Sequence, residues 1–178
     1  MSEIFTVGHS TRSAAELLEL LRSAGVRVVA DVRAYPGSRR HPQFARTELA
    51  RWLPEAGIAY VHLPALGGRR RLDASSVVGG GWREPAFRAY AQHMRTAEFA
   101  AGLEALERLA REHPTAIMCA EALWWRCHRR LIADALYARG WRIRHLGSGA
   151  ERSSHELPPF AAVDDGQITY QGTQPPLL

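Results

Sequence analysis

The chain contains no lysine, and all 23 of its basic residues are arginine. No lysine amine is therefore available to form a Schiff base or to act as a general base. Any recognition of an anion by a cationic side chain must use the guanidinium group, which is planar, always charged and well matched to phosphate. The formal net charge of +5 allows a nucleic-acid partner without requiring one.

Long apolar runs and cysteines are also scarce. No apolar run approaches the roughly 20 residues that a membrane-spanning helix needs, and the first residues lack the basic start and apolar stretch of a signal peptide. The two cysteines, Cys119 and Cys127, cannot form the disulfide framework of a small secreted domain. We therefore expect a cytoplasmic protein with no membrane partner.

Strand-like and helix-like segments alternate along most of the chain. This alternation predicts one α/β domain over residues 1–150, with a mostly parallel sheet of about five strands and helices on both faces. Residues 151–178 are rich in Pro, Ser and Gly. They are expected to form a C-terminal extension, packed on the domain or trailing from it, with one short strand over residues 167–171. Apolar runs predict strands at residues 4–7, 26–32, 58–63, 115–119 and 141–146, and amphipathic spacing predicts helices at residues 13–24, 47–56, 85–112 in two pieces, and 127–139.

Polar side chains fall where the predicted strands end. In open α/β sheets, ligands bind at the carboxyl ends of the strands, so these residues are candidates for one site. The strand ends carry His9 and Ser10, then Asp31 and Arg33, then Cys119 and Glu121, with Arg39 and Arg40 in the loop after the second strand.

Two of these strand ends allow two interpretations each. The backbone N–H groups of residues 8–10 precede a helix and could bind an anion. Alternatively, Ser10, Thr11 or Ser13 simply caps that helix. Asp31 and Arg33 lie on the same face of a strand and form either a structural ion pair or a carboxylate that positions a ligand.

The segment 119–130 is the richest in reactive side chains. One interpretation is a cysteine nucleophile beside His and Arg, with Cys127 in the first turn of a helix, where the dipole favours a thiolate. A second is a metal held by Cys119, Glu121, Cys127 and His128, although the cysteine spacing is not that of known zinc sites. A third is that both cysteines fill the core. The density of these groups favours a functional site, and no other cofactor is predicted.

Tryptophans occur in two of the predicted loops. Trp82 lies in a glycine-rich loop, and Trp124 and Trp125 lie between the two cysteines. Each ring could stack on a nucleic-acid base, a contact worth about 1–3 kcal/mol, or could fill the core beneath its loop.

Several short motifs follow one another in a fixed order along the chain, at residues 6–12, 30–33, 38–44, 62–64, 66–70, 87–90, 119–121 and 127–129. Together they resemble the bacterial and archaeal domain of unknown function family 488 over about residues 4–146. The resemblance implies a small α/β domain whose motifs gather at one end of the sheet, and it implies no activity. Members of that family often carry Asp-Pro where this chain has Leu123-Trp124, so any role of that aspartate is absent here.

These observations predict an enzyme or ligand-binding domain for an anionic substrate, which would be a phosphorylated compound, a nucleotide or a nucleic acid. The alternative is a non-catalytic nucleic-acid or nucleotide binder that uses arginine for phosphate and tryptophan for stacking. A third reading is a partner-binding adaptor, whose polar residues would be dispersed in space. The predicted catalytic residues are His9, Asp31, Cys119, Glu121, Cys127 and His128, and the predicted substrate-binding residues are Ser10, Arg33, Arg39, Arg40, Arg129, Trp82 and Trp124.

Overall fold

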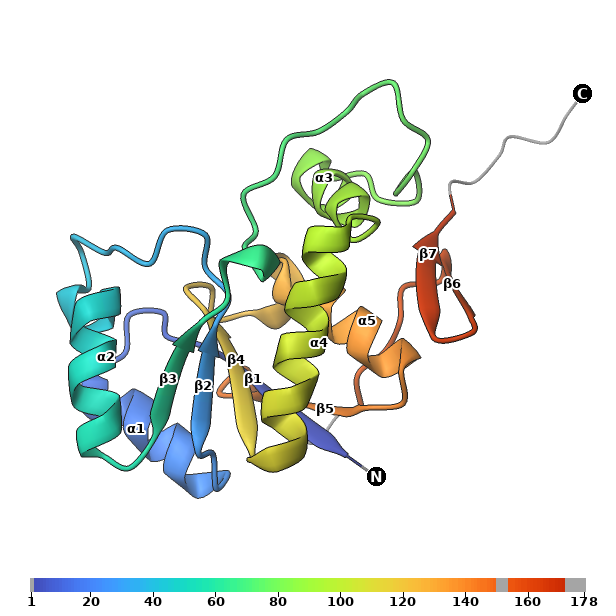
Figure 1. Ribbon diagram of the computed structural model, residues 1–178. Helices are drawn as coiled ribbons and strands as arrows, with labels where there is room; N and C mark the ends of the chain where they lie inside the picture. The colour runs from blue at the N-terminus through green and yellow to red at the C-terminus, as the bar shows by residue number, and fades with distance from the viewer. Residues whose placement is uncertain (1, 150–153, 172–178) are drawn as a thin grey trace, which may run out of the picture.

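A five-stranded parallel sheet forms the centre of the protein (Figure 1). The computed structural model describes residues 2–149 and 154–171. The strands lie in the order β3-β2-β4-β1-β5, and every neighbouring pair is parallel. The predicted α/β fold is therefore confirmed, with strand bounds close to those expected. The strands are β1 Glu3–Gly8, β2 Val28–Asp31, β3 Ala59–His62, β4 Thr115–Cys119 and β5 Arg142–Leu146.

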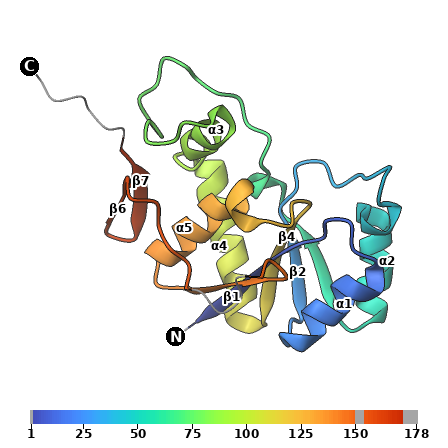
Figure 2. The same cartoon turned by 180° about the vertical axis from the view of Figure 1, so that it is seen from behind.

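Helices cover both faces of the sheet (Figures 1 and 2). On one face lie α1 Ala14–Ser23 and α2 Arg46–Glu55, and on the other lie α4 Ala97–Glu112 and α5 Arg129–Ala138. Helix α3, Pro85–His93, lies above the carboxyl ends of the strands in Figure 1. Within the described ranges, no helix combines the length and the apolar character that crossing a bilayer would require.

The strand order explains why the helices divide between two faces. From β1 to β2 to β3 the chain moves toward one edge of the sheet, and from β3 to β4 to β5 it moves back toward the other edge. Right-handed crossovers then place the helices of the two halves on opposite faces. Strand β4 lies between β2 and β1. The segment that follows β4 therefore leads to one face of the sheet, and the segments that follow β1 and β2 lead to the other face. Diverging loops of this kind create a crevice at the carboxyl ends.

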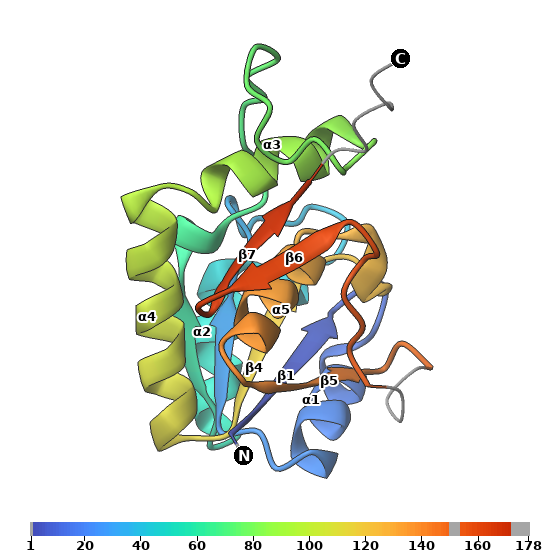
Figure 3. The same ribbon diagram turned by 90° about the vertical axis from the view of Figure 1, so that its right-hand side faces the viewer.

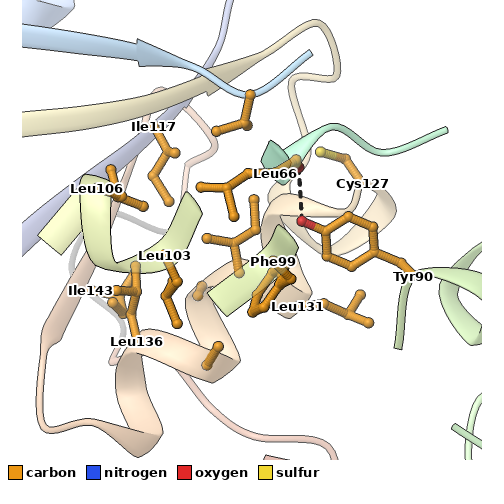
Figure 4. Packing of buried hydrophobic residues seen from close by; sticks show 14 of the residues in the cluster. Leu66, Tyr90, Phe99, Leu103, Leu106, Ile117, Cys127, Leu131, Leu136 and Ile143 are labelled. Carbon is orange, nitrogen blue, oxygen red and sulfur yellow. Dashed lines mark hydrogen bonds between the residues drawn. The ribbon is translucent and has the colours of Figure 1, made fainter. Parts of the chain in front are cut away.

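Each face of the sheet has its own apolar core. Alternation along β4 directs Ala116 and Met118 toward α1 and α2, and directs Ile117 and Cys119 toward α4 and α5. Figure 4 shows the second cluster, in which the Tyr90 hydroxyl donates a hydrogen bond to the Leu66 carbonyl at 2.8 Å. Cys127 belongs to the same cluster. Both sulfurs therefore lie where the core meets the carboxyl end of the sheet.

The C-terminal extension folds back onto the domain as a hairpin (Figure 3). Strands β6, Ala161–Asp164, and β7, Gln167–Tyr170, pair antiparallel and lie beside α5. One strand was predicted here and two are present. Their turn places Asp165 and Gly166 at φ values of 46° and 74°, as a tight hairpin turn requires. The remaining parts of the predicted extension, residues 151–153 and 172–178, lie outside the described residues.

Candidate functional site

A cavity of about 770 Å³ lies at the carboxyl ends of the strands. Its lining comes from the segments after β1, β2, β3 and β4, so residues far apart in the sequence converge as expected. This convergence contradicts the dispersed arrangement that a partner-binding adaptor predicted. The predicted residues that line the cavity are His9, Ser10, Arg33, Arg39, Arg40, Cys119, Glu121, Cys127 and His128.

The two cysteine sulfurs lie at the base of this cavity, only 2.8 Å apart. Cys119 is the last residue of β4, and Cys127 precedes α5. The prediction that Cys127 lies in the first turn of a helix is wrong, because α5 begins at Arg129 and Cys127 has extended backbone after a short 3₁₀ turn, Trp124–Arg126. The helix still contributes, because the Arg129 N–H points at the Cys127 sulfur at 3.3 Å.

His128 is oriented to act on the Cys127 sulfur. Its Nε2 lies 2.8 Å from the Val32 carbonyl. Since a carbonyl only accepts hydrogen bonds, Nε2 carries the proton in the neutral ring, and the lone pair is on Nδ1. That Nδ1 lies 3.7 Å from the Cys127 sulfur. The ring is confined by Gly68, where an added Cβ would lie 2.5 Å from Nδ1. His128 is therefore placed to accept the thiol proton.

Arg129 is a buried cation beneath the same sulfurs. Its side chain is covered almost completely, and it donates to the Glu121 carbonyl at 2.5 Å and to the Thr6 hydroxyl at 3.3 Å. Within the described part of the chain, Arg129 forms no ion pair with a carboxylate, and its Nε has no hydrogen-bond partner. Burial lowers the pKa of Arg129, but the negative potential of Cys119 and Cys127 outweighs burial and raises it. The sulfurs are thus the counter-charge of this guanidinium.

The pKa values of the two thiols are shifted in opposite directions. Burial raises the pKa of Cys119 well above its ordinary value, and the neighbouring Cys127 raises it further. Burial also opposes ionisation of Cys127, but the hydrogen bonds from Cys119 and His128, together with the charges of His128 and Arg129, hold the pKa of Cys127 well below its ordinary value. Of the two sulfurs, Cys127 is therefore the one whose surroundings favour a thiolate.

Asp31 and Arg33 form the structural ion pair that was one of their two interpretations. Asp31 is completely buried and accepts from the Arg33 Nη2 and Nε at 2.7 and 2.9 Å and from the Tyr60 hydroxyl at 2.5 Å. Arg33 also donates to the Phe44 carbonyl at 2.8 Å. Asp31 does not line the cavity, so it is a positioning residue for Arg33, which does.

His9 is held neutral. Its Nδ1 lies 3.0 Å from the Ser10 carbonyl and donates to it, which leaves the Nε2 lone pair facing the Arg33 Nη1 at 3.3 Å. Burial lowers the pKa of His9 to about 4, and the Arg33 charge lowers it in the same direction. Because its free lone pair is occupied by Arg33, His9 supports the arginine and is not available as the proton carrier that was expected.

Of the two interpretations of residues 8–10, the helix cap is confirmed and the anion site at the His9 and Ser10 N–H groups is wrong. The His9 and Ser10 N–H groups donate to the Cys119 and Ala120 carbonyls at 2.9 and 3.0 Å and continue the β1–β4 pairing past the strand ends. Gly8 allows this approach, because a Cβ there would lie 1.8 Å from the Glu121 carbonyl oxygen. The cap of α1 is Ser13, in a reciprocal pair with Glu16. Ser10 still lines the cavity, with a φ of 49° that non-glycine residues rarely adopt.

The rim of the cavity is strongly cationic. Glu121 is the only acidic residue among its lining residues, and the Glu121 carboxylate accepts the Leu123 N–H at 3.2 Å. None of the exposed rim arginines forms an ion pair with a carboxylate among the residues that the structure describes. The predicted site residues did not include Arg69 and Arg126, because nothing in the local sequence around either arginine places it beside a strand end. These rim arginines are Arg39, Arg40, Arg69 and Arg126.

Two predicted substrate-binding tryptophans lie away from the cavity. Trp82 is buried in the α4–α5 core against Phe87, Phe160 and Tyr170, so its expected role in base stacking is wrong. The physical reason is that the glycine-rich loop folds inward under the C-terminal hairpin. Trp124 stacks on His145 with ring centroids 4.0 Å apart. Neither ring lines the cavity.

The proposed metal set is not assembled. Across residues 2–149 and 154–171, no group of three or more His, Cys, Asp or Glu side chains is placed to hold a metal ion. The Glu121 carboxylate turns toward the backbone of its own loop, and the His128 Nε2 is taken by Val32. Both sulfurs are left as free thiols.

Comparison with known protein families gives a match to a family model. The sequence model of a family described as "Domain of unknown function DUF488" matches residues 13–136. This range includes Arg33, both cysteines, His128 and Arg129. No curated protein matches the chain, and no solved structure does.

Proposed function

The chain belongs to the DUF488 family, whose description assigns no activity, and we propose that it is an enzyme that uses the Cys127 thiolate to attack an anionic substrate. The observation that carries the proposal is one cluster. A sulfur with a lowered pKa lies 3.7 Å from the lone pair of His128, above the buried Arg129 guanidinium, at the base of an arginine-lined cavity. Low-pKa thiols beside cationic groups are typical of nucleophilic cysteines.

Substrate binding depends on the rim. Arg39, Arg40, Arg69 and Arg126 surround an opening that holds one carboxylate, so the local potential favours an anion. Arg33 also lines the cavity and is held by Asp31 and the Phe44 carbonyl, with its Nη1 facing His9. A phosphate or carboxylate matches the fork of a guanidinium group. The cavity volume suits a ligand of nucleotide or small-peptide size.

The chemical step places the thiol proton on the His128 Nδ1 and forms a bond between the Cys127 sulfur and an electrophilic atom of the substrate. The leaving group then takes that proton from the imidazolium. Arg129 stabilises the thiolate before attack. The proposal requires reduced thiols, which is consistent with the cytoplasm as the compartment.

The test is alkylation of the native protein with iodoacetamide, followed by peptide mass spectrometry across a pH series. We expect Cys127 to react at a pH well below that needed by a free cysteine. Cys127→Ser should abolish this reaction and Cys119→Ser should keep most of it. The proposal fails if Cys127 in the folded protein reacts no faster at neutral pH than an unfolded control.

Anion binding is tested by protection of Cys127 from the same reagent. Inorganic phosphate, a nucleoside monophosphate and a short single-stranded oligonucleotide are the probes. The most effective probe identifies the substrate class. The double variant R39A/R40A should lose protection, whereas Arg108→Ala, an exposed arginine on α4 far from the cavity, should retain it. Equal protection in both variants would contradict a role for the rim.

A further inference from the structure

We propose that Cys119 is the resolving thiol of this site, and that Cys119 and Cys127 cycle between a dithiol and an intramolecular disulfide. This inference rests on the proposed function, because it takes Cys127 as the attacking group. It assigns the substrate class as well: an anionic organic disulfide, which is reduced by two electrons to its thiols.

The geometry of the sulfur pair carries the inference. The sulfurs are 2.8 Å apart, and a disulfide bond of about 2.05 Å requires them to approach by less than about 1 Å. Cys119 ends β4, and Cys127 lies in the loop that leads from β4 to α5, two residues before the helix begins. The change in sulfur position that the disulfide requires is therefore small.

The contacts of each sulfur indicate that Cys127 is the attacking thiol and Cys119 the resolving thiol. The Cys127 sulfur receives the Arg129 N–H and faces His128, so it has the groups that stabilise a thiolate. The Cys119 sulfur lies against Cys127, the Glu121 carbonyl at 3.8 Å and the Arg129 guanidinium, and it has no contact with His128 among the described residues. Cys119 is also the more deeply buried of the two, with 3% of its surface exposed against 8% for Cys127. Cys127 is therefore the sulfur that a substrate meets first.

The reaction balances in two steps. In the first, the Cys127 thiolate attacks one sulfur of the substrate R–S–S–R and forms a mixed disulfide, and the departing sulfur takes the proton held by His128 and leaves as R–SH. In the second, the Cys119 thiol attacks the Cys127 sulfur, and its proton passes to the second departing sulfur, which leaves as R–SH and completes the Cys119–Cys127 disulfide. The two substrate sulfurs gain two electrons, and the protein sulfurs lose two. A cellular thiol or dithiol then restores the reduced pair by the same exchange in reverse.

The cavity favours an anionic disulfide over a hydroperoxide. A small peroxide would need access to the sulfur but no cationic rim, whereas a disulfide carrying carboxylates would use the arginines on both sides of the opening. The buried Arg129 also affects the relative stability of the reduced and oxidised pairs. Oxidation removes its negative partner and leaves a buried guanidinium with carbonyl and hydroxyl contacts only. The reduced pair is thus stabilised relative to the disulfide, so a cellular thiol regenerates it readily, and excess substrate disulfide over thiol drives the forward exchange.

The experiment compares oxidised glutathione, which is anionic, with bis(2-hydroxyethyl) disulfide, which is neutral. Intact-mass spectrometry follows the reduced full-length protein after each reagent is added. We expect the wild type to lose two hydrogen masses without a lasting adduct. Cys119→Ser and Cys119→Ala should instead stop at a stable mixed disulfide on Cys127, and Cys127→Ser should not react. The anionic reagent should react at least about tenfold faster, and R39A/R40A should remove that advantage.

The outcomes separate this inference from the proposed function. If Cys127 alkylates rapidly but the wild type keeps the mixed disulfide, the resolving role of Cys119 is overturned and the nucleophile stands. If Cys127 is inert toward both iodoacetamide and disulfides, both proposals fail. Formation of the disulfide with hydrogen peroxide but with neither organic disulfide overturns the substrate class. Thermal unfolding of the Ser and Ala variants at position 119 checks that their behaviour reports chemistry and not loss of fold.

Discussion

Individual glycines shape the site as much as its reactive residues do. Gly8 lets the segment after β4 close over the end of β1, and Gly68 leaves room for the His128 ring. Neither glycine has a positive φ, so the lack of a Cβ, and not backbone freedom, is what each position requires. Arg129 matters for a different reason: among the described residues it has no carboxylate partner, and the cysteine sulfurs beside it raise the pKa of its guanidinium.

Replacing Gly68 with alanine should disturb His128 directly. The added Cβ would meet Nδ1 and Cγ of the ring at 2.5 and 2.7 Å, so the ring must shift and lose its present alignment with the Cys127 sulfur. We expect a loss of about 1–3 kcal/mol of stability from overpacking and a slower alkylation of Cys127 at neutral pH. Gly37→Ala is the matched control, since Gly37 also lines the cavity but has no atom within 4 Å of the added Cβ. An unchanged alkylation rate in a folded Gly68→Ala protein would contradict the role of His128.

Replacing Tyr60 with phenylalanine should weaken the support of Arg33. The change removes the 2.5 Å hydrogen bond to the buried Asp31 carboxylate and leaves that acceptor less satisfied. We expect unfolding in urea to show a loss of about 1–3 kcal/mol. Tyr35→Phe, at a side chain that is 75% exposed, should change stability by less than about 0.5 kcal/mol. Equal stability of the two variants would show that the Tyr60 hydrogen bond adds nothing to the stabilisation of the Asp31 carboxylate by Arg33.

Among the elements, α5 connects the site to the C-terminal hairpin. Its first residues surround the sulfurs, and its Asp134 accepts from the His155 Nε2 at 2.7 Å and from the Tyr170 hydroxyl at 2.6 Å. His155 also meets the Nε2 of His145 on β5 at 3.0 Å. The described part of the extension is therefore attached by a buried polar network and not by apolar contact alone.

Replacing Asp134 with alanine should release this extension first. The change leaves the buried His155 and Tyr170 groups without their acceptor, and we expect a cost of about 3–5 kcal/mol. Hydrogen exchange should rise over residues 154–171 before it rises in the sheet. Asp164→Ala, an exposed carboxylate on β6, serves as the control and should leave exchange unchanged. Uniform loss of protection across the whole chain would argue against a separately attached segment.

On the scale of the whole molecule, buried neutral histidines predict a loss of stability in acid. Burial lowers the pKa of His145 to about 3, with the charges of His155 and Arg129 adding to the effect, and the pKa of His9 falls to about 4. The unfolded chain, with histidine pKa values near 6.5, binds more protons below that pH. Stability is therefore complete above about pH 6.5 and declines as the pH falls toward these folded values.

At pH 5, each of the two histidines should lower the free energy of unfolding by about 2 kcal/mol, since each pKa unit corresponds to about 1.4 kcal/mol. Urea unfolding at a series of pH values between 5 and 8 measures it. His145→Gln should flatten the dependence in this range, even where it lowers stability overall, while replacement of the exposed His113 should not. A stability that rises on acidification would contradict the assignment of neutral buried rings.

The cationic cavity is also a property of the whole chain, because no single element supplies it. Its arginines come from the segments after β2, β3 and β4, and each is unremarkable in its own segment. The sequence predicted Arg39 and Arg40 as site residues because they follow a strand end. Arg69 and Arg126 lie at the cavity because of the strand order, which the sequence did not predict.

The sequence by itself determined the alternation of strands and helices, the parallel direction of the sheet and the edge at which Cys119, His128 and Arg33 gather. These features depend on periodicity within a few residues and on the fact that parallel strands all end at one edge. The Asp165–Gly166 pair also marked a hairpin turn that the sequence reading did not use. Only the tertiary structure decided that the two sulfurs touch, that the N–H groups of His9 and Ser10 are occupied, and that Trp82 is buried. Each of these is a contact between different segments of the chain, fixed by strand order, register and packing, which no local pattern of residues encodes.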